Sequence, residues 1–157
     1  MSGAEHVEIR PYEPEDQPGF AQLVATVLAE YGFSVDPILE ADLEHPEISY
    51  QGVWVAIDDD HLVGSIAIRL LDDGQAQLKR MYLQPEHRGR GLGRTLLSHA
   101  IHWARDRGCH AIVLDTSTAM TAAQRLYESA GFSRTGTRTE AGANDSRCEV
   151  LYRLDLA

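Results

Sequence analysis

Apolar residues recur along the chain with two different periods, and these periods predict where helices and strands lie. In residues 16–31 the apolar positions are three or four residues apart, which is the spacing of a helix that buries one face. The same spacing returns in residues 92–107 and 119–130. Gly108 and Gly131 come directly after these two segments, where a residue of positive φ often ends a helix. The pattern therefore predicts three amphipathic helices.

Between the helices, short runs rich in β-branched residues alternate with turn residues, which is typical of strands. A further short helix is predicted over about 36–43. The run at 110–114 is apolar and lies between two helices, so we expect a parallel, buried strand there. Early strands joined by turns and later strands alternating with helices predict an α/β (α+β) domain, with a mixed sheet flanked by helices. The predicted strands cover 7–10, 52–57, 62–71, 75–83, 110–114, 132–139 and 147–155.

Length and composition favour one domain with its own core, formed by residues 1–157. No apolar run approaches the roughly 20 residues that span a bilayer, and the N-terminus has no signal-peptide pattern. Cys109 and Cys148 have neither metal-ligand nor disulfide spacing, and the seven histidines form no recognisable metal set. We therefore expect a cytoplasmic protein that binds no metal and does not enter the membrane.

Charge is distributed unevenly along the chain, whose net charge is −10. Residues 1–60 contain fourteen acidic side chains and one basic one, Arg10, whereas residues 79–107 contain seven basic and two acidic ones. The basic segment suits an anionic cofactor. The acidic segment suits a cationic second substrate, although acids that only solvate the surface explain it equally well. The acidic balance argues against nucleic acid as a partner.

The segment 81–93 carries the clearest functional signal. It is predicted to be the end of a strand, a loop of glycines and arginines, and the first turn of a helix. Such a loop presents backbone N–H groups at the positive end of the helix dipole, where phosphate groups bind. A dinucleotide-binding fold is disfavoured, because Gly89, Gly91 and Gly93 do not have its glycine spacing.

This segment resembles the coenzyme A signature of the GNAT acetyltransferase superfamily, in which Arg or Gln precedes x-x-Gly-x-Gly or Ala. Arg88, Gly91 and Gly93 match that pattern. A second segment, Ala123–Phe132, is similar to the superfamily's Ala-x-x-Leu-Tyr-x-x-x-Gly-Phe and lies one strand and one helix downstream. The resemblance begins at about residue 50. It implies a GNAT-like mixed, mostly antiparallel sheet and an acetyl-CoA-dependent N-acetyltransferase.

The resemblance also implies roles for individual residues. Backbone N–H groups of the glycine loop would hold the pyrophosphate of coenzyme A, with arginines adding charge. A bulge in the strand that ends at Leu83 would free N–H groups for the thioester carbonyl and the pantetheine arm. Tyr127 would donate a proton to the leaving thiolate; the alternative is a tyrosine that only packs at the core edge. The cofactor-binding residues implied are Met81, Leu83, Arg88, Gly89, Arg90, Gly91, Leu92, Gly93 and Arg94.

Two positions depart from the family pattern. Gln77 stands where some members carry a glutamate that deprotonates the amine, and Met120 stands where many carry an asparagine that binds the cofactor. Glu149 is a weak substitute for the missing base, since a solvated strand carboxylate explains it better. His87 is expected at the surface beside the phosphates rather than as a base.

Together these observations predict direct transfer of an acetyl group from acetyl-CoA to a primary amine of a cationic small molecule. Two alternatives remain: a non-catalytic acyl-CoA-binding module that regulates a partner, and a peptide or protein N-acetyltransferase. Pairing of edge strands between two chains would give a homodimer.

Overall fold

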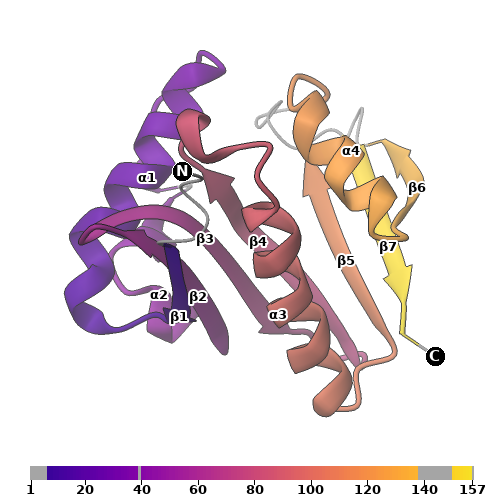
Figure 1. The fold of residues 1–157 in the computed structure, drawn as a ribbon. Helices are drawn as coiled ribbons and strands as arrows, with labels where there is room; N and C mark the ends of the chain where they lie inside the picture. Colours follow the sequence, from indigo (N-terminus) through magenta and orange to yellow (C-terminus); the bar gives the residue numbers. More distant parts are fainter. Residues whose placement is uncertain (1–6, 39, 138–149, 157) are drawn as a thin grey trace.

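The computed structural model describes residues 7–38, 40–137 and 150–156, and its centre is one sheet (Figure 1). In the described part of the chain the sheet has seven strands in the order β1-β2-β3-β4-β5-β7-β6. Neighbouring strands are antiparallel except β4 and β5, which are parallel. The mixed, mostly antiparallel sheet is as predicted. The strands are β1 (Val7–Pro11), β2 (Gly52–Asp58), β3 (His61–Leu70), β4 (Gln75–Leu83), β5 (Ala111–Thr116), β6 (Ser133–Thr137) and β7 (Val150–Asp155).

Helices cover both faces of this sheet (Figure 1). One face packs against α3 and α4, and the other packs against α1. The helices are α1 (Gln17–Glu30), α2 (Pro46–Ser49), α3 (Leu92–Asp106) and α4 (Thr121–Ser129), with 3-10 turns η2 (Pro14–Asp16), η3 (Ala41–Leu43) and η4 (Pro85–His87). The three amphipathic helices predicted from periodicity are therefore confirmed, each within about two residues of its predicted ends.

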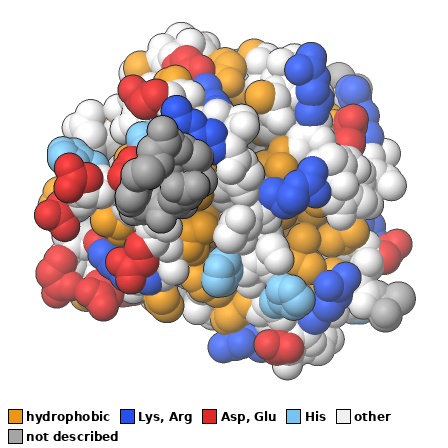
Figure 2. All heavy atoms as spheres, in the orientation of Figure 1, with side chains coloured by type: hydrophobic (Ala, Val, Ile, Leu, Met, Phe, Trp, Pro, Cys, Tyr) orange, Lys and Arg blue, Asp and Glu red, His pale blue; other side chains and the backbone are white. Residues whose placement is uncertain are grey.

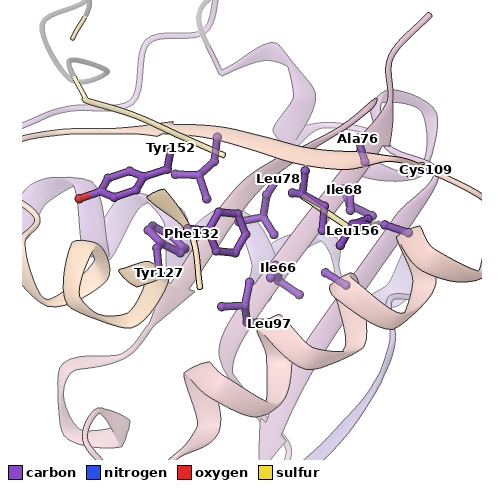
Figure 3. Close-up of a cluster of buried hydrophobic side chains, with 14 of the residues drawn as sticks. Ile66, Ile68, Ala76, Leu78, Leu97, Cys109, Tyr127, Phe132, Tyr152 and Leu156 are labelled. Carbon is purple, nitrogen blue, oxygen red and sulfur yellow. The ribbon is translucent and has the colours of Figure 1, made fainter. Parts of the chain in front are cut away.

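Two hydrophobic clusters hold the layers together. The larger one fills the space between the sheet and α3 and α4, and Figure 3 shows Ile66 of β3 beside Leu97 of α3 and Phe132 near Tyr127. The smaller one lies beneath α1, around Phe20 and Val24. Deleting a buried leucine side chain from such a core costs about 2–5 kcal/mol. The functional site therefore rests on a sheet that is fixed from both sides.

The prediction of a helix over 36–43 is wrong. Side chains bind the backbone here: the Glu40 carboxylate accepts the Asp36 N–H at 2.7 Å, and the Asp36 carboxylate accepts the Ile38 N–H at 2.8 Å. Acidic side chains that bond to nearby N–H groups compete with helix formation. Among its described residues the segment forms only the turn η3, and the short helix α2 begins after it, at Pro46.

Strand β4 separates from β5 midway along its length. The two strands pair from Gln75–Ala111 to Gln77–Val113, and the described pairs end there. Beyond this point the register of β4 with β3 shifts, and Arg80 takes the left-handed conformation with φ +54°. This is a β-bulge, the feature implied by the family resemblance. It opens a gap between β4 and β5, and the candidate site lies in that gap.

Candidate active site

The bulge is fixed by a buried ion pair. Arg80 donates from Nε and Nη2 to the two carboxylate oxygens of Asp42, at 2.9 and 2.7 Å. The Asp42 carboxylate also accepts the Tyr50 hydroxyl at 2.6 Å, and Ser65 Oγ donates to the Arg80 carbonyl at 2.8 Å. The side chains of Arg80 and Asp42 are only 10% and 13% exposed. The connection between α1 and β2 is therefore bound directly to the irregular part of β4.

The charges in this network depend on one another. Burial alone would raise the pKa of Asp42, but the paired Arg80 guanidinium and the Tyr50 hydroxyl more than offset it, so that pKa lies below its ordinary value. Burial and the adjacent Asp42 carboxylate raise the pKa of Tyr50. Asp42 is therefore an anion, and Tyr50 a neutral donor, at physiological pH.

The glycine loop leads into the N-terminus of α3 without a side-chain cap. Gly91 occupies the N-cap position with φ +86°, and Gly89 also has positive φ. A Cβ built at either glycine meets no atom within 4 Å, so the space above the loop is open. The first N–H groups of a helix have no partner within it. Those of Leu92, Gly93 and Arg94 are therefore available to an anionic ligand.

A cavity of about 300 Å³ lies beside this loop. Met81 and Leu83 of β4 form one wall, and Ala123 and Leu126 of α4 form another. Two predicted residues, Arg90 and Leu92, do not line the cavity: the Arg90 side chain is exposed, and that of Leu92 is buried. The predicted cofactor-binding residues that do line it are Met81, Leu83, Arg88, Gly89, Gly91, Gly93 and Arg94.

Arg88 has a structural task that its sequence position did not reveal. Its guanidinium donates to the Leu83 carbonyl, at 2.9 Å from Nη2 and 3.2 Å from Nε. It also donates to both carboxylate oxygens of Glu30, at 2.6 and 2.8 Å. The hydrogen bond from Arg88 lowers the pKa of Glu30. Arg88 therefore connects the loop to the ends of β4 and α1.

His87 is not the surface residue that the sequence predicted. Its side chain is 14% exposed, and Nε2 lies 2.8 Å from an Asp58 carboxylate oxygen at the end of β2. Among the described residues, its buried Nδ1 has no hydrogen-bond partner. The residue joins η4 to the end of β2, and it is not among the residues that line the two cavities. The prediction failed because sequence does not show which strand end lies beneath the turn.

Acidic residues of the first sixty thus pair with residues 80–88, at the end of β4 and in the turn that follows it. Asp42, Glu30 and Asp58 bind Arg80, Arg88 and His87, respectively. The remaining asymmetry is visible in Figure 2, where acidic side chains gather on the side of α1 and β1 and basic ones on the side of α4. Part of the charge imbalance is therefore neutralised beside the cavities.

Tyr127 both packs in the core and reaches the site. Its ring lies 5.7 Å from that of Phe132 and 6.1 Å from that of Tyr152, centroid to centroid (Figure 3). The residue is 5% exposed, and burial raises the pKa of its phenol, with smaller contributions from Tyr82 and Asp115. Tyr127 lines a second cavity, of about 110 Å³. The two interpretations from sequence are compatible, because the ring packs while the residue borders a cavity.

The two cavities meet in the gap between β4 and β5. Met81 and Tyr82 from β4, and Met120 and Ala123 from the β5–α4 side, line both of them. The loop before α3 therefore borders one of two adjacent cavities, and Tyr127 borders the other.

The position of the family's glutamate base holds an amide that is already engaged. Gln77 accepts a hydrogen bond from Arg69 Nε at 2.7 Å through its carbonyl oxygen. Sequence reasoning missed the carboxylates that do line the small cavity, Glu40 and Asp115. Asp115 was within reach of prediction, because it follows the apolar run 110–114 at the carboxyl end of a parallel strand, where ligands bind. Glu149 and Cys148 lie outside the described residues.

Other kinds of site find no support in the part of the chain that the structure describes. There, no group of three or more His, Cys, Asp or Glu side chains is placed to hold a metal ion. None of the described helices combines the length and the apolar character needed to cross a bilayer.

Comparison with known proteins agrees with this geometry. The family model described as the acetyltransferase (GNAT) family matches residues 20–132. Human N-acetyltransferase 8B is 35% identical over 112 residues, covering 65% of this chain and 49% of its own, so the chain spans about half the length of that relative. An acetyltransferase from Streptococcus agalactiae superimposes with a TM-score of 0.85 at 29% identity, covering 97% of this chain and 99% of its own.

A putative acetyltransferase from Salmonella typhimurium, solved with its cofactor acetyl-CoA, shares the fold. Its TM-score is 0.74 at 24% identity, and the match covers 97% of this chain and 95% of that one.

Proposed function

Because the chain belongs to the GNAT family of acetyltransferases, we propose that it is an enzyme that transfers the acetyl group of acetyl-CoA to a primary amine of a small molecule. The observation that carries the proposal is the pair of adjacent cavities at the gap between β4 and β5. It has uncapped helix N–H groups at one end and a buried phenol at the other. The first end suits a pyrophosphate, and the second suits a leaving thiolate.

The glycine loop supplies the pyrophosphate site in this proposal. The N–H groups of Leu92, Gly93 and Arg94 face the open space that Gly89 and Gly91 leave. A Cβ at position 93 would lie 3.1 Å from Leu126 Cδ2, so glycine there also lets α3 and α4 approach. The Salmonella relative solved with acetyl-CoA supports this choice of cofactor.

Backbone groups of β4 supply the donors for the acyl carbonyl. The Gln84 N–H bonds to the Val63 carbonyl of β3 at 2.8 Å. Successive N–H groups of a strand point to opposite edges, so those of Leu83 and Met81 are directed to the gap. Donors placed there polarise a thioester and stabilise the oxyanion that forms when an amine attacks.

Tyr127 acts as the acid. The amine nitrogen bonds to the carbonyl carbon, the tetrahedral intermediate collapses, and the carbon–sulfur bond breaks. The thiolate takes the phenol proton, and the proton lost by the amine restores the phenol through solvent. Burial keeps the Tyr127 phenol protonated by raising its pKa. Glu40 and Asp115 are among the residues that line the small cavity, and we propose them as candidates to take the proton of the amine on its way to solvent.

The experiment is a thiol-release assay with acetyl-CoA and a panel of amines. Tyr127→Phe should lower kcat by about 100-fold, the lower end for a general acid, while acetyl-CoA affinity is kept. Tyr152→Phe is the matched control, because it removes a neighbouring phenol that bonds to Glu128 at 2.7 Å instead of lining either cavity. Equal kcat for wild type and Tyr127→Phe would refute the role of Tyr127. Tight acetyl-CoA binding without turnover of any amine would favour the regulatory module, and acetylated peptides would favour a peptide N-acetyltransferase.

Three finer predictions stay attached to this proposal. The prediction of a cationic acceptor is weakened, because three acidic residues of the N-terminal segment are already paired. The panel includes a polyamine and an aminoglycoside to test it. A cytoplasmic setting agrees with the buried free thiol of Cys109 and is tested by fractionation. Light scattering tests the homodimer.

A further inference from the structure

We propose that the small cavity receives the head group of an α-amino acid, whose carboxylate binds Lys79 while its amine is directed to the acyl carbonyl. The inference rests on the acetyl transfer proposed above and names its acceptor class. It begins from an unusual residue: Lys79 is the only lysine of the chain, all its other Lys or Arg positions being arginine.

Lys79 lines the small cavity together with Tyr127. It pairs with Ala67 of β3, whose side chain packs beneath α1, so Lys79 lies on the α1 face of the sheet. The neighbouring cation, Arg80, forms an ion pair with Asp42. Lys79, in contrast, forms no ion pair with a carboxylate among the described residues. A half-buried ammonium is stabilised by an anion, and here a ligand would supply it.

The cavity also presents negative charge. Two acidic residues, Glu40 and Asp115, are among those that line it. A plain amine, which enters as an ammonium ion, would meet these carboxylates but would also be repelled by Lys79. A compact molecule with an ammonium and a carboxylate matches both signs of charge, and opposite charges at these distances attract strongly where water is partly excluded.

The volume of the cavity sets the size of the group that it encloses. At about 110 Å³ it is smaller than the engineered cavity of about 150 Å³ that accepts benzene. It therefore holds about five non-hydrogen atoms, and the thioester would reach Tyr127 from the adjacent larger cavity. The head group of an α-amino acid has that size: one nitrogen, the α-carbon, the carboxyl carbon and two oxygens. An aminoglycoside ring exceeds it.

The strand geometry brings the two binding groups within reach of one head group. Lys79 and Met81 are two residues apart on β4, which corresponds to about 7 Å between their Cα atoms, or less across a bulge. The long lysine side chain covers part of that distance. An amine that attacks an acyl carbonyl bound at the Met81 N–H can thus direct its carboxylate, one carbon away, toward Lys79.

The test compares amines that differ only by the carboxylate. Phenylalanine is paired with phenethylamine, methionine with 3-(methylthio)propylamine, and leucine with isoamylamine, and kcat/KM is measured for each. We expect a preference of at least about tenfold for the amino acid of each pair, because a site built for a polar group rejects the analogue that lacks it. Lys79→Gln should remove that preference mainly by raising KM for amino acids, with kcat/KM for plain amines kept within about twofold.

Two outcomes overturn the inference while leaving the acetyltransferase intact. One is a plain amine that wild type uses as well as its amino acid counterpart. The other is a Lys79→Gln variant that loses activity equally toward both. Lys79→Arg, which keeps the charge, is the matched control and should retain the preference. Absence of turnover with every acceptor would overturn the proposed function itself.

A second measurement reads binding without turnover. Since Lys79 is the only lysine, an amine-reactive acetylating reagent modifies only it and the N-terminus. With coenzyme A bound, phenylalanine should slow Lys79 modification, followed by peptide mass spectrometry, while phenethylamine should not. Equal rates with both ligands would contradict a carboxylate on Lys79.

Discussion

Removing the carboxylate of Asp42 should destabilise the protein more than any exposed charge does. In Asp42→Ala the Arg80 guanidinium, 10% exposed, loses two hydrogen bonds and its counter-charge, and the Tyr50 hydroxyl loses its acceptor. Breaking a buried ion pair from one side typically costs about 3–5 kcal/mol. For a domain of this size, that corresponds to a melting temperature lower by about 10 °C.

Urea denaturation of Asp42→Ala, compared with wild type, measures this loss. Asp155→Asn is the control, because its pair with Arg153 is exposed, at 72% for the Asp155 side chain, and such pairs contribute about 0–1 kcal/mol. The double variant Asp42→Leu/Arg80→Leu should recover part of the loss, since no buried charge remains unpaired. A loss below about 1 kcal/mol for Asp42→Ala would refute the reasoning, and so would a double variant that is no more stable than Asp42→Ala.

The pH dependence of stability follows from the same pair, because the pKa of Asp42 is lower in the folded state than in the unfolded state. The Asp42 carboxylate therefore contributes fully to the free energy of unfolding above the unfolded carboxyl pKa of about 4. That contribution disappears as the pH falls through the lower folded-state pKa. Acid titration of wild type should therefore show a larger loss of stability below about pH 4 than that of Asp42→Ala, in which only the other paired carboxylates contribute. Gly91→Ala, at φ +86°, should cost about 1–2 kcal/mol in urea denaturation and weaken acetyl-CoA binding by calorimetry; unchanged values would show that the N-cap tolerates a side chain. Glu30→Gln should change stability by less than about 1 kcal/mol, because the pair with Arg88 is about one-third exposed, and should tighten acetyl-CoA binding at low salt by removing a negative charge.

Elements with a period of their own were predictable from sequence. The faces of α1 and α3 follow from residue spacing, and the glycine loop follows from the chemistry of a helix N-terminus. The structure of the segment 36–43 was not predictable in this way, because its side chains form hydrogen bonds with nearby backbone N–H groups that compete with helix formation. Contacts between distant residues were equally hidden. Nothing in the sequence pairs Asp42 with Arg80, thirty-eight positions away, since that contact depends on how the α1–β2 connection crosses the sheet.

The chemistry divides in the same way. The place of Tyr127 at the edge of a cavity could be expected from the motif around it, whereas its packing against Tyr152 depends on β7 lying beside α4. The amide at position 77 follows from the sequence, whereas the structure shows that Arg69 donates a hydrogen bond to its carbonyl oxygen. Lys79 carried no signal in the sequence, because a single lysine within a basic segment gives no indication of facing a cavity.

The pairing of acidic residues from the first sixty with residues 80–88 affects how this protein can be redesigned. Glu30, Asp42 and Asp58 belong to the part of the chain that precedes the glycine loop, yet each secures a residue between positions 80 and 88. A foreign acceptor-binding segment grafted in place of the first sixty residues would remove all three anchors at once. Such a chimera would keep the sequence of the glycine loop but not the contacts that fix its conformation, unless the graft places acidic residues at positions 30, 42 and 58.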